Sequence, residues 1–166
     1  MVQFGDAISK NLHQEVFSFT RYLLDHPHDD VRNIHPAYNS VMVSLNSTST
    51  LASISEYVLS AIDSIKNTES IMPRTVEVPV MYGGENGPDL DKVSENTGLS
   101  SSEVIKRHSE AEYLVYFIGF SIGFPYLGGM DLSIATPRLD SPRKSVPKGS
   151  IGIAGDQTGI YPLSYP

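Results

Sequence analysis

The chain has 166 residues and is 40% hydrophobic, a composition typical of a globular domain. Its formal net charge of -7 and isoelectric point near 5.1 argue against non-specific nucleic-acid binding, which requires a basic surface. Because there is no cysteine, disulfides, thiol nucleophiles and zinc–thiolate sites are excluded. The sequence contains no stretch of about 18 apolar residues and no signal-peptide pattern, so we expect a cytoplasmic protein that does not bind membranes.

Residues 1–80 show the element order of a ferredoxin-like, split βαβ domain. Alternating apolar residues predict strands, and apolar residues at three- and four-residue steps predict amphipathic helices. The expected strands are Val2–Phe4, Val31–His35, Ser40–Leu45 and Arg74–Met81. The expected helices run from a cap at Ser9 to Asp25, and from Leu51 to about Lys66. The sequence therefore predicts a small α+β domain in this half of the chain.

Residues 26–30 read His-Pro-His-Asp-Asp and contain side chains that divalent metal ions accept as ligands. Their spacing does not match a known zinc site. A histidine is also favoured near a helix C-terminus, where the helix dipole is negative. We therefore predict no metal site on this chain.

Residues 82–89 read Tyr-Gly-Gly-Glu-Asn-Gly-Pro-Asp, between a predicted strand and a predicted helix. A glycine loop in such a position can hold phosphate, but no Lys-Ser or Lys-Thr pair follows these glycines. Pro88 as the first helical residue and Asp89 in the first turn explain the segment as the start of a helix. Two helices are then expected, Asp89–Asn96, which ends at Gly98, and Ser101–Ser109.

His108, near the end of the second of these helices, is a weak candidate for a general base, because imidazole titrates near neutral pH. The alternative is a histidine with a purely structural role. Asp131 is a second weak candidate for catalysis. Residues 119–123 match the letters G-x-S-x-G, but they end a predicted strand and no helix follows, so a hydrolase nucleophile elbow is not expected.

Residues Tyr113–Phe120 predict a buried strand, and beyond them Gly and Pro recur every few positions, which predicts rigid loops. Arg138 and Arg143 each follow a proline, whose fixed φ lowers the entropy lost when a guanidinium binds an anion. A carboxylate or phosphate site is one interpretation, and pairing with surface carboxylates is the other. The polar residues of the segment are Asp131, Arg138, Arg143, Lys148, Asp156, Gln157, Thr158 and Tyr161.

These residues lie within motifs that closely resemble the family of 5-oxoprolinase B subunits, also named allophanate hydrolase subunit 1 or Kip-type sensor-kinase inhibitor. The motifs are R-H-S-E-A-E-Y, G-F-S-I-G-F-P-Y-L-G-G-M-D, A-T-P-R, S-P-R and V-P-K-G-S-I-G-I-A-G-D-Q-T-G-I-Y-P. The resemblance covers nearly the whole chain and is strongest from Val76 onward. Ile122 stands where the family usually has Pro, and Asp156 where it usually has Gly. Both ends are short relative to the family pattern, so we expect a truncated chain or, alternatively, a homo-oligomer that covers an open sheet edge.

The resemblance implies that residues 81–166 form an incomplete cyclophilin-like β-barrel. It also implies a subunit of an ATP-dependent 5-oxoprolinase, which converts 5-oxoproline to glutamate with A- and C-type partner subunits. ATP is then bound at the level of the complex, and the chain alone is expected to be inactive. In this interpretation Arg138, Arg143 and Lys148 bind anionic groups. Gln157 and Tyr161 form hydrogen bonds with the ring amide, and Asp131 orients an arginine. The candidate substrate- and anion-binding residues are Tyr126, Arg138, Arg143, Lys148, Gln157 and Tyr161.

The resemblance also implies an alternative function, because the family includes an inhibitor of a sensor histidine kinase. A binding role of this kind would use Phe124, Tyr126 and Leu127 as exposed apolar anchors. Packing of the same three residues in a core is the competing interpretation. The older family name adds allophanate hydrolysis as a third function, which is based on that name more than on any residue of the chain.

Overall fold

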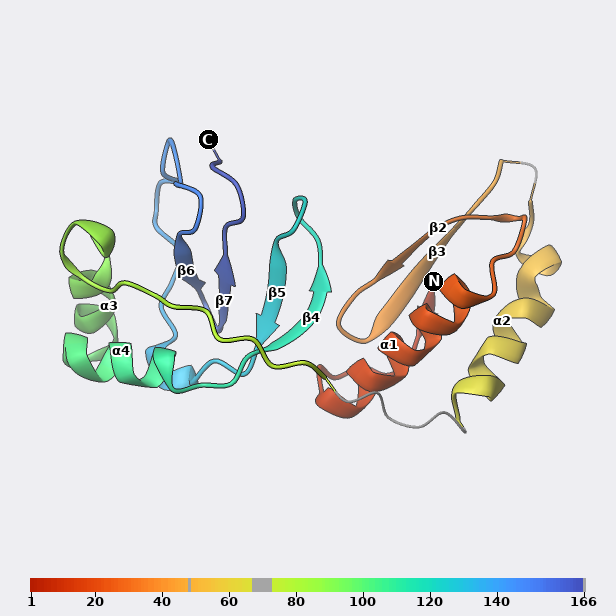
Figure 1. Ribbon diagram of the computed structural model, residues 1–166, viewed down its shortest axis with the longest axis horizontal. Coiled ribbons are helices and arrows are strands. Elements are labelled where there is room, and N and C mark those ends of the chain that lie inside the picture. The colour runs from red at the N-terminus through yellow and green to blue at the C-terminus, as the bar shows by residue number, and fades with distance from the viewer. Residues whose placement is uncertain (48, 67–72, 166) are drawn as a thin grey trace. The chain divides into compact units, whose positions relative to one another are not determined.

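The computed structural model describes residues 1–47, 49–66 and 73–165. The chain forms two compact units, Met1–Arg74 and Thr75–Pro166. Each unit contains helices and one antiparallel sheet, so the fold is mixed α+β. The two units are shown in Figure 1 and are described separately below.

The first unit has a three-stranded antiparallel sheet and two helices. The strands are β1 (Val2–Gln3), β2 (Val31–Pro36) and β3 (Ser40–Leu45), in the order β1-β3-β2. The helices are α1 (Lys10–Asp25) and α2 (Leu51–Ile65). The hydroxyl of Ser9 caps α1 by accepting from the Leu12 amide at 3.2 Å, and Thr50 and Ser53 form a capping box at the start of α2. These caps explain why both helices begin where the sequence predicts.

The core of the first unit lies where α1 packs against the sheet and α2 (Figure 1). Its buried residues are Val16, Phe19, Leu23, Val41 and Ala61. On α1 these residues recur at three- and four-residue steps, which places them on one face of the helix. Burying a side chain as large as Phe19 or Leu23 stabilises a fold by about 1.5 to 3 kcal/mol.

The fourth strand predicted for this unit, Arg74–Met81, is wrong. Residues 73–82 form no strand, and the side chains of Val76 and Val78 are 60% and 53% exposed. Alternating valines favour an extended chain, but a strand also requires a neighbour that accepts its backbone hydrogen bonds. In the described residues no strand pairs with this segment, so the sheet of the first unit has three strands.

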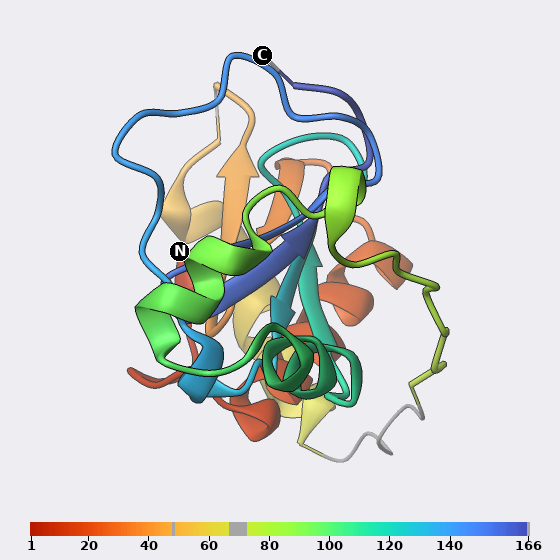
Figure 2. The same ribbon diagram turned by 90° about the vertical axis from the view of Figure 1, so that its left-hand side faces the viewer.

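The second unit has a four-stranded antiparallel sheet in the order β4-β5-β7-β6. The strands are β4 (Leu114–Ile118), β5 (Pro125–Gly128), β6 (Ile151–Ala154) and β7 (Gln157–Ile160). The helical elements are η1 (Gly84–Asn86), α3 (Leu90–Thr97), α4 (Ser101–Ser109) and η2 (Leu132–Ile134). Figures 1 and 2 show α3 and α4 side by side, with η2 packed against both.

Two details of the second unit differ from the sequence-based expectation. Helix α3 begins at Leu90, so Pro88 precedes the helix instead of opening it. The helix ends as expected at Gly98, whose φ of +72° favours glycine. The Gly- and Pro-rich segment, expected to be loop, contains β5 and β7. Their glycines Gly128 and Gly159 lie where aromatic rings pack against the sheet.

Candidate functional site

The two faces of the β4-β5-β7-β6 sheet carry different side chains. Leu127 on β5, Thr158 on β7 and Ile153 on β6 are in register and therefore share one face. Ile153 packs against the buried cluster of α4, η2 and the chain between them, which consists of Val104, Met130 and Ile134. This face is the core side of the second unit.

The opposite face is lined by glycines with aromatic rings lying on them. A Cβ atom at Gly128 would lie 2.2 Å from the ring of Tyr116, and one at Gly159 would lie 2.6 Å from the ring of Phe124. At Gly152 the corresponding distance to the Tyr161 ring is 3.6 Å, an ordinary contact. Glycine therefore permits rings to approach this part of the sheet more closely than any other residue would.

Six rings cover this face, and together they are named the aromatic layer: Tyr116, Phe117, Phe124, Tyr126, Tyr161 and Tyr165. The ring of Tyr126 stacks on Phe117 with centroids 4.3 Å apart. Phe124 meets Tyr126 and Tyr161 edge-on, at 5.6 and 5.3 Å. The structure thus brings two candidate residues, Tyr126 and Tyr161, onto one face through Phe124. All six rings are only partly buried, so the layer is open to contact.

Gln157 and Lys148 lie close to this layer in the backbone. Gln157 opens β7 opposite Ala154 and shares the glycine face with Gly159. The amide of Lys148 donates to Ser164 Oγ at 3.0 Å, and the next amide, that of Gly149, donates to the Tyr161 carbonyl at 2.7 Å. The exposed side chain of Lys148 therefore starts beside the C-terminal end of the aromatic layer.

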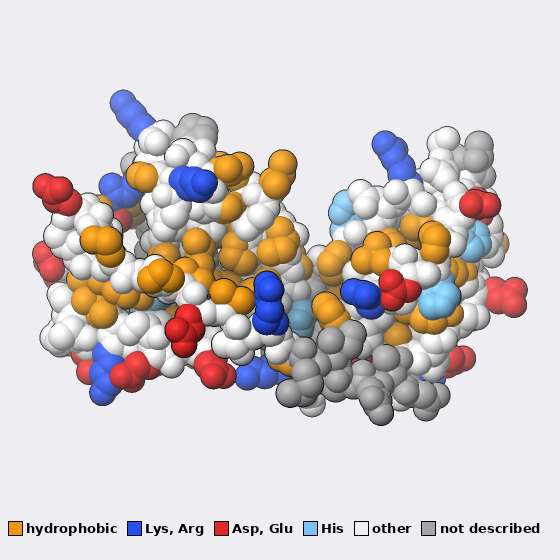
Figure 3. All heavy atoms as spheres, viewed as in Figure 1, with side chains coloured by type: hydrophobic (Ala, Val, Ile, Leu, Met, Phe, Trp, Pro, Cys, Tyr) orange, Lys and Arg blue, Asp and Glu red, His pale blue; other side chains and the backbone are white. Residues whose placement is uncertain are grey.

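The two candidate arginines differ in their surroundings. Arg143 forms an ion pair with Asp89, and the two side chains are 41% and 46% exposed. Arg138 is exposed and, like Lys148, has no ion-pair partner among the residues that the structure describes. On the face that Figure 3 shows, the visible Lys and Arg side chains of the second unit lie at separate points. Within the described residues, two candidate cations are thus available to bind an anion, and the third is already paired.

His108 is enclosed and bonded through both ring nitrogens. Its side chain is buried, Nδ1 lies 2.7 Å from the Tyr82 hydroxyl, and Nε2 lies 3.0 Å from Thr158 Oγ1. The hydroxyl of Tyr113 donates to the His108 carbonyl at 2.7 Å. Burial lowers the pKa of His108 and raises the pKa of Tyr82, and it raises the pKa of Tyr113 to about 12. A histidine held in this way has no ring nitrogen turned toward a substrate.

The carboxylate of Asp131 is also bonded to neighbouring groups. Its Oδ1 accepts from the Ser133 amide at 2.9 Å and thereby caps η2, while Oδ2 lies 3.4 Å from Arg107. The hydrogen bonds from Ser133, together with the charge of Arg107, lower the pKa of this carboxyl. Arg107 itself also binds Glu103 at 2.8 Å. Asp131 therefore contacts an arginine that is not among the candidate anion-binding residues.

The glycine loop 83–87 does not fit the phosphates of ATP. Two of its amides are used internally, since Asn86 N donates to Gly83 O at 3.2 Å and Gly87 N donates to Gly84 O at 3.3 Å. A Cβ at Gly87 would lie 2.4 Å from the nitrogen of Gly83, so the loop closes on itself. No lysine directly follows the last glycine as it does in a phosphate-binding loop.

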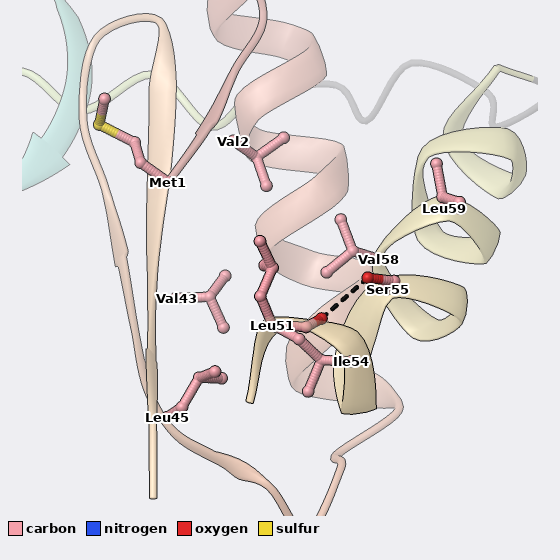
Figure 4. A pocket seen from close by; sticks show the side chains of 9 residues that line it. All are labelled: Met1, Val2, Val43, Leu45, Leu51, Ile54, Ser55, Val58 and Leu59. Carbon is pink, nitrogen blue, oxygen red and sulfur yellow. Dashed lines mark hydrogen bonds between the residues drawn. The ribbon is translucent and has the colours of Figure 1, made fainter. Parts of the chain in front are cut away.

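A hollow of about 280 Å³ lies in the first unit between β1, β3 and α2 (Figure 4). Its lining is apolar except for Ser55, whose hydroxyl is bonded to the Leu51 carbonyl. It holds none of the candidate residues. Among the described residues no three His, Asp or Glu side chains lie together as metal ligands, and no described helix is long and apolar enough to cross a membrane.

Sequence reasoning missed the side chains that organise this unit, namely Tyr82, Arg107 and Tyr113, and it noted Thr158 only as a polar residue. Tyr82 and Thr158 lie 26 and 50 positions from His108. No local spacing connects residues so far apart. The motif R-H-S-E-A-E-Y contains Arg107, His108 and Tyr113, and the motif that includes Q-T-G contains Thr158, but neither motif indicates which of these side chains contact one another.

The sequence profile of the family described as carboxyltransferase domain, subdomain C and D, matches residues 1–166. The chain belongs to this family. The 5-oxoprolinase B subunit of Bacillus subtilis (strain 168) is 39% identical over 177 residues, which cover 100% of this chain and 74% of the relative. The 5-oxoprolinase B subunit of Escherichia coli O157:H7 is 40% identical over 159 residues, covering 92% of this chain and 69% of the relative. The resemblance carried by the sequence motifs is confirmed.

A solved member of the same fold is TTHA0988, which superimposes with a TM-score of 0.78 at 31% identity. The match covers 99% of this chain and 31% of that chain, so the present chain spans about a third of the length of TTHA0988. The mixed α+β architecture with two antiparallel sheets is therefore found in a relative of known structure.

Proposed function

We propose that this chain acts as part of the B-type subunit of an ATP-dependent 5-oxoprolinase and works with A- and C-type subunits. The observation that carries the proposal is the similarity to two 5-oxoprolinase B subunits, at 39% and 40% identity over 100% and 92% of the chain. The reaction opens the lactam ring of 5-oxoproline to give glutamate. The chain is expected to be inactive without its partners.

The substrate has one carboxylate and one planar ring amide, and the second unit offers groups suited to both. Arg138 and Lys148, which are exposed and lack ion-pair partners among the described residues, are proposed to bind the carboxylate. Tyr126, Tyr161 and Gln157, on the glycine face of the sheet, are proposed to contact the ring and its amide. Arg143 contributes only if it leaves Asp89.

ATP is assigned to the assembled complex and not to this chain. The glycine loop 83–87 has the amides of Asn86 and Gly87 bonded internally and lacks the lysine of a phosphate-binding loop. Activation of the lactam therefore falls to the partner subunits, while this chain holds and orients the substrate. His108 and Asp131 are both bonded to neighbouring groups of the chain, and neither is proposed to be catalytic.

We also propose that residues 1–80 represent a ferredoxin-like domain and residues 81–166 part of a cyclophilin-like barrel. Two helices packed with three antiparallel strands support the first assignment, although its fourth strand is missing from the described residues. The four-stranded antiparallel sheet supports the second. The absence of cysteine is consistent with the cytoplasm as the proposed compartment.

The test is 5-oxoproline-dependent ATP hydrolysis by the cognate A- and C-type subunits with and without this chain. We expect activity only in the complete mixture. Arg138→Ala and Lys148→Ala should raise the KM for 5-oxoproline by about tenfold, because each removes a charged hydrogen bond. Lys92→Ala, an exposed lysine on α3, is the matched control and should change nothing. Failure of every mixture of folded partners to hydrolyse ATP would exclude the function, and an unchanged KM in both variants would exclude the site.

A second candidate function, inhibition of a sensor histidine kinase, has one observation in its favour. The turn between β4 and β5 exposes apolar side chains, with Phe120 71% and Ile122 89% exposed. The anchors expected from the sequence, Phe124, Tyr126 and Leu127, are partly buried instead. Autophosphorylation of a kinase from the same cell should fall when the chain is added and recover with Phe120→Ser/Ile122→Ser. Unchanged labelling with the original chain excludes that kinase as a target.

A further inference from the structure

Three segments that are far apart in the sequence meet at the imidazole of His108. The Tyr82 hydroxyl, just before η1, lies 2.7 Å from Nδ1, and Oγ1 of Thr158, on β7, lies 3.0 Å from Nε2. The side chains of His108 and Thr158 are both 6% exposed, so water does not compete for these bonds. One ring on α4 therefore joins the segment before the glycine loop to a central strand of the sheet.

The donor and the acceptor in each of these two hydrogen bonds can be assigned. A neutral imidazole has one donor nitrogen and one acceptor nitrogen. The phenol of Tyr82 is a stronger acid than the aliphatic hydroxyl of Thr158, so Tyr82 donates to Nδ1 and Nε2–H donates to Thr158 Oγ1. We propose that His108 is a positioning residue that holds Tyr82 and the glycine loop 83–87 on strand β7, and that only its neutral Nε2–H tautomer does so. The inference concerns the second unit itself and is independent of the reaction proposed above.

The glycine loop depends on this attachment because its own hydrogen bonds are internal. Gly83 and Gly84 have φ values of +77° and +55°, and the amides of Asn86 and Gly87 bond to the carbonyls of the same two glycines. At the far end of the segment Asp89 is paired with Arg143. The loop is thus attached on one side through Tyr82 and on the other through an ion pair. A change at His108 is expected to reach Arg143 by this route.

Acid is expected to release the attachment. Protonation turns Nδ1 into a donor, so the Tyr82 hydroxyl loses its acceptor and a positive charge is buried. The titratable groups near the ring are the neutral phenols of Tyr82 and Tyr113, and burial raises the pKa of both. Among the charged groups of the neighbouring elements, Asp131 forms an ion pair with Arg107. The charged side chains of α3 are exposed, namely those of Asp91, Lys92 and Glu95. In the described part of the chain no carboxylate is bonded to the imidazole to stabilise its charge.

The tautomer and the coupling can both be read from NMR spectra of the unaltered, ¹⁵N- and ¹³C-labelled chain. We expect the ¹⁵N signals of His108 to show a protonated Nε2 and an unprotonated Nδ1 at pH 7.5. On acidification we expect the imidazole to titrate below its ordinary value of 6.5, with the amide signals of Gly83 and Gly84 moving at the same midpoint. A protonated Nδ1 at pH 7.5, or glycine amides that do not follow the imidazole, would overturn the proposal.

Three variants separate positioning from simple packing. Tyr82→Phe keeps the ring and removes the hydroxyl, so the imidazole should titrate at higher pH and the glycine amides should no longer follow it. Thr158→Val removes the acceptor of Nε2–H and should shift the ¹⁵Nε2 signal of His108, whereas Thr158→Ser keeps a hydroxyl and should retain the original spectrum. A purely structural role predicts that Thr158→Ser and Thr158→Val behave alike, and that result would contradict the proposal.

Discussion

The two units of this protein are stabilised in different ways. The buried apolar cluster of the first unit consists of large side chains together with one alanine, Val16, Phe19, Leu23, Val41 and Ala61, and one histidine, His13, is also buried in this unit. The core cluster of the second unit has fewer buried apolar residues, and two polar residues buried in this unit, His108 and Thr158, are bonded to each other. The second unit adds glycines on which aromatic rings lie, such as Gly159 under Phe124.

The difference explains why the candidate chemistry is found in the second unit. An apolar core tolerates small shifts, because the hydrophobic effect has no preferred direction. Hydrogen bonds and ring-on-glycine contacts depend on distance and angle, so they hold side chains in defined positions. The rings of Tyr126 and Tyr161 are held by their ring contacts, and the imidazole of His108 is held by its hydrogen bonds. Substitutions should therefore act through lost volume in the first unit and through lost geometry in the second.

The largest effect is expected from Phe19→Ala in the first unit. Phe19 is 0% exposed, so truncation leaves a cavity and should lower the free energy of unfolding by about 3 to 5 kcal/mol. Urea unfolding measures the change. Phe17→Ala on the same helix is the control, since Phe17 is 44% exposed and its loss should have a much smaller effect. Equal destabilisation by both variants would contradict the assignment of this core.

The next effect is expected from Gly159→Ala in the second unit. The new Cβ would lie 2.6 Å from the Phe124 ring, which is itself packed against Tyr126 and Tyr161, so overpacking should destabilise by about 1 to 3 kcal/mol. Gly152→Ala is the matched control, because the nearest ring atom there is 3.6 Å away. Near-ultraviolet circular dichroism should report displaced tyrosines only in the first variant. Wild-type stability of Gly159→Ala would show that the layer can move freely.

A smaller effect on the free energy of unfolding is expected from a change in pH. One buried histidine in each unit allows the two units to be compared directly. Burial lowers the pKa of His13 in the first unit and of His108 in the second. The unfolded chain therefore binds protons at higher pH than the folded chain, so the free energy of unfolding should be lower at pH 5.5 than at pH 7.5. His13→Gln and His108→Gln should each reduce this difference, while His35→Gln, at an exposed position, should not. Identical pH dependence in all three variants would contradict the burial of these rings.

The smallest effect is expected from Arg143→Ala. The Arg143–Asp89 pair is exposed by 41% and 46%, and such surface pairs contribute less than about 1 kcal/mol. Urea unfolding should detect little change, and added salt should make it smaller still. Asp89→Asn removes the same pair from the other side and should match it. A loss of several kcal/mol in either variant would mean that this ion pair holds the second unit together.

The helices could be predicted from the sequence almost to the residue. Ser9 and Thr50 cap α1 and α2, and Gly98 ends α3 in the left-handed conformation, because each of these signals acts on backbone groups a few residues away. The strands were predicted less accurately from the sequence. The valines of Arg74–Met81 alternate as in a strand and yet pair with no strand in the described residues, whereas Gly- and Pro-rich β5 and β7 are paired.

The candidate site was predicted only in part. The motifs indicated Tyr126, Gln157 and Tyr161, and the structure brings the two tyrosines onto one face with Gln157 on the same side of the sheet. They could not reveal that Arg143 is paired with Asp89, 54 residues earlier in the chain. Nor could they indicate Tyr82 and Thr158 as the two partners of His108.

The sequence by itself determined the helices, the apolar face of α1, the absence of cysteine chemistry and the family, since composition, local backbone signals and rigid motifs can all be read along one chain. The tertiary structure decided which strands pair, which carboxylate holds Arg143 and which partners hold His108. The last two outcomes depend on contacts between residues 26 to 54 positions apart. Such contacts form only when the whole unit folds, because their loop-closure entropy must be offset by many interactions at once.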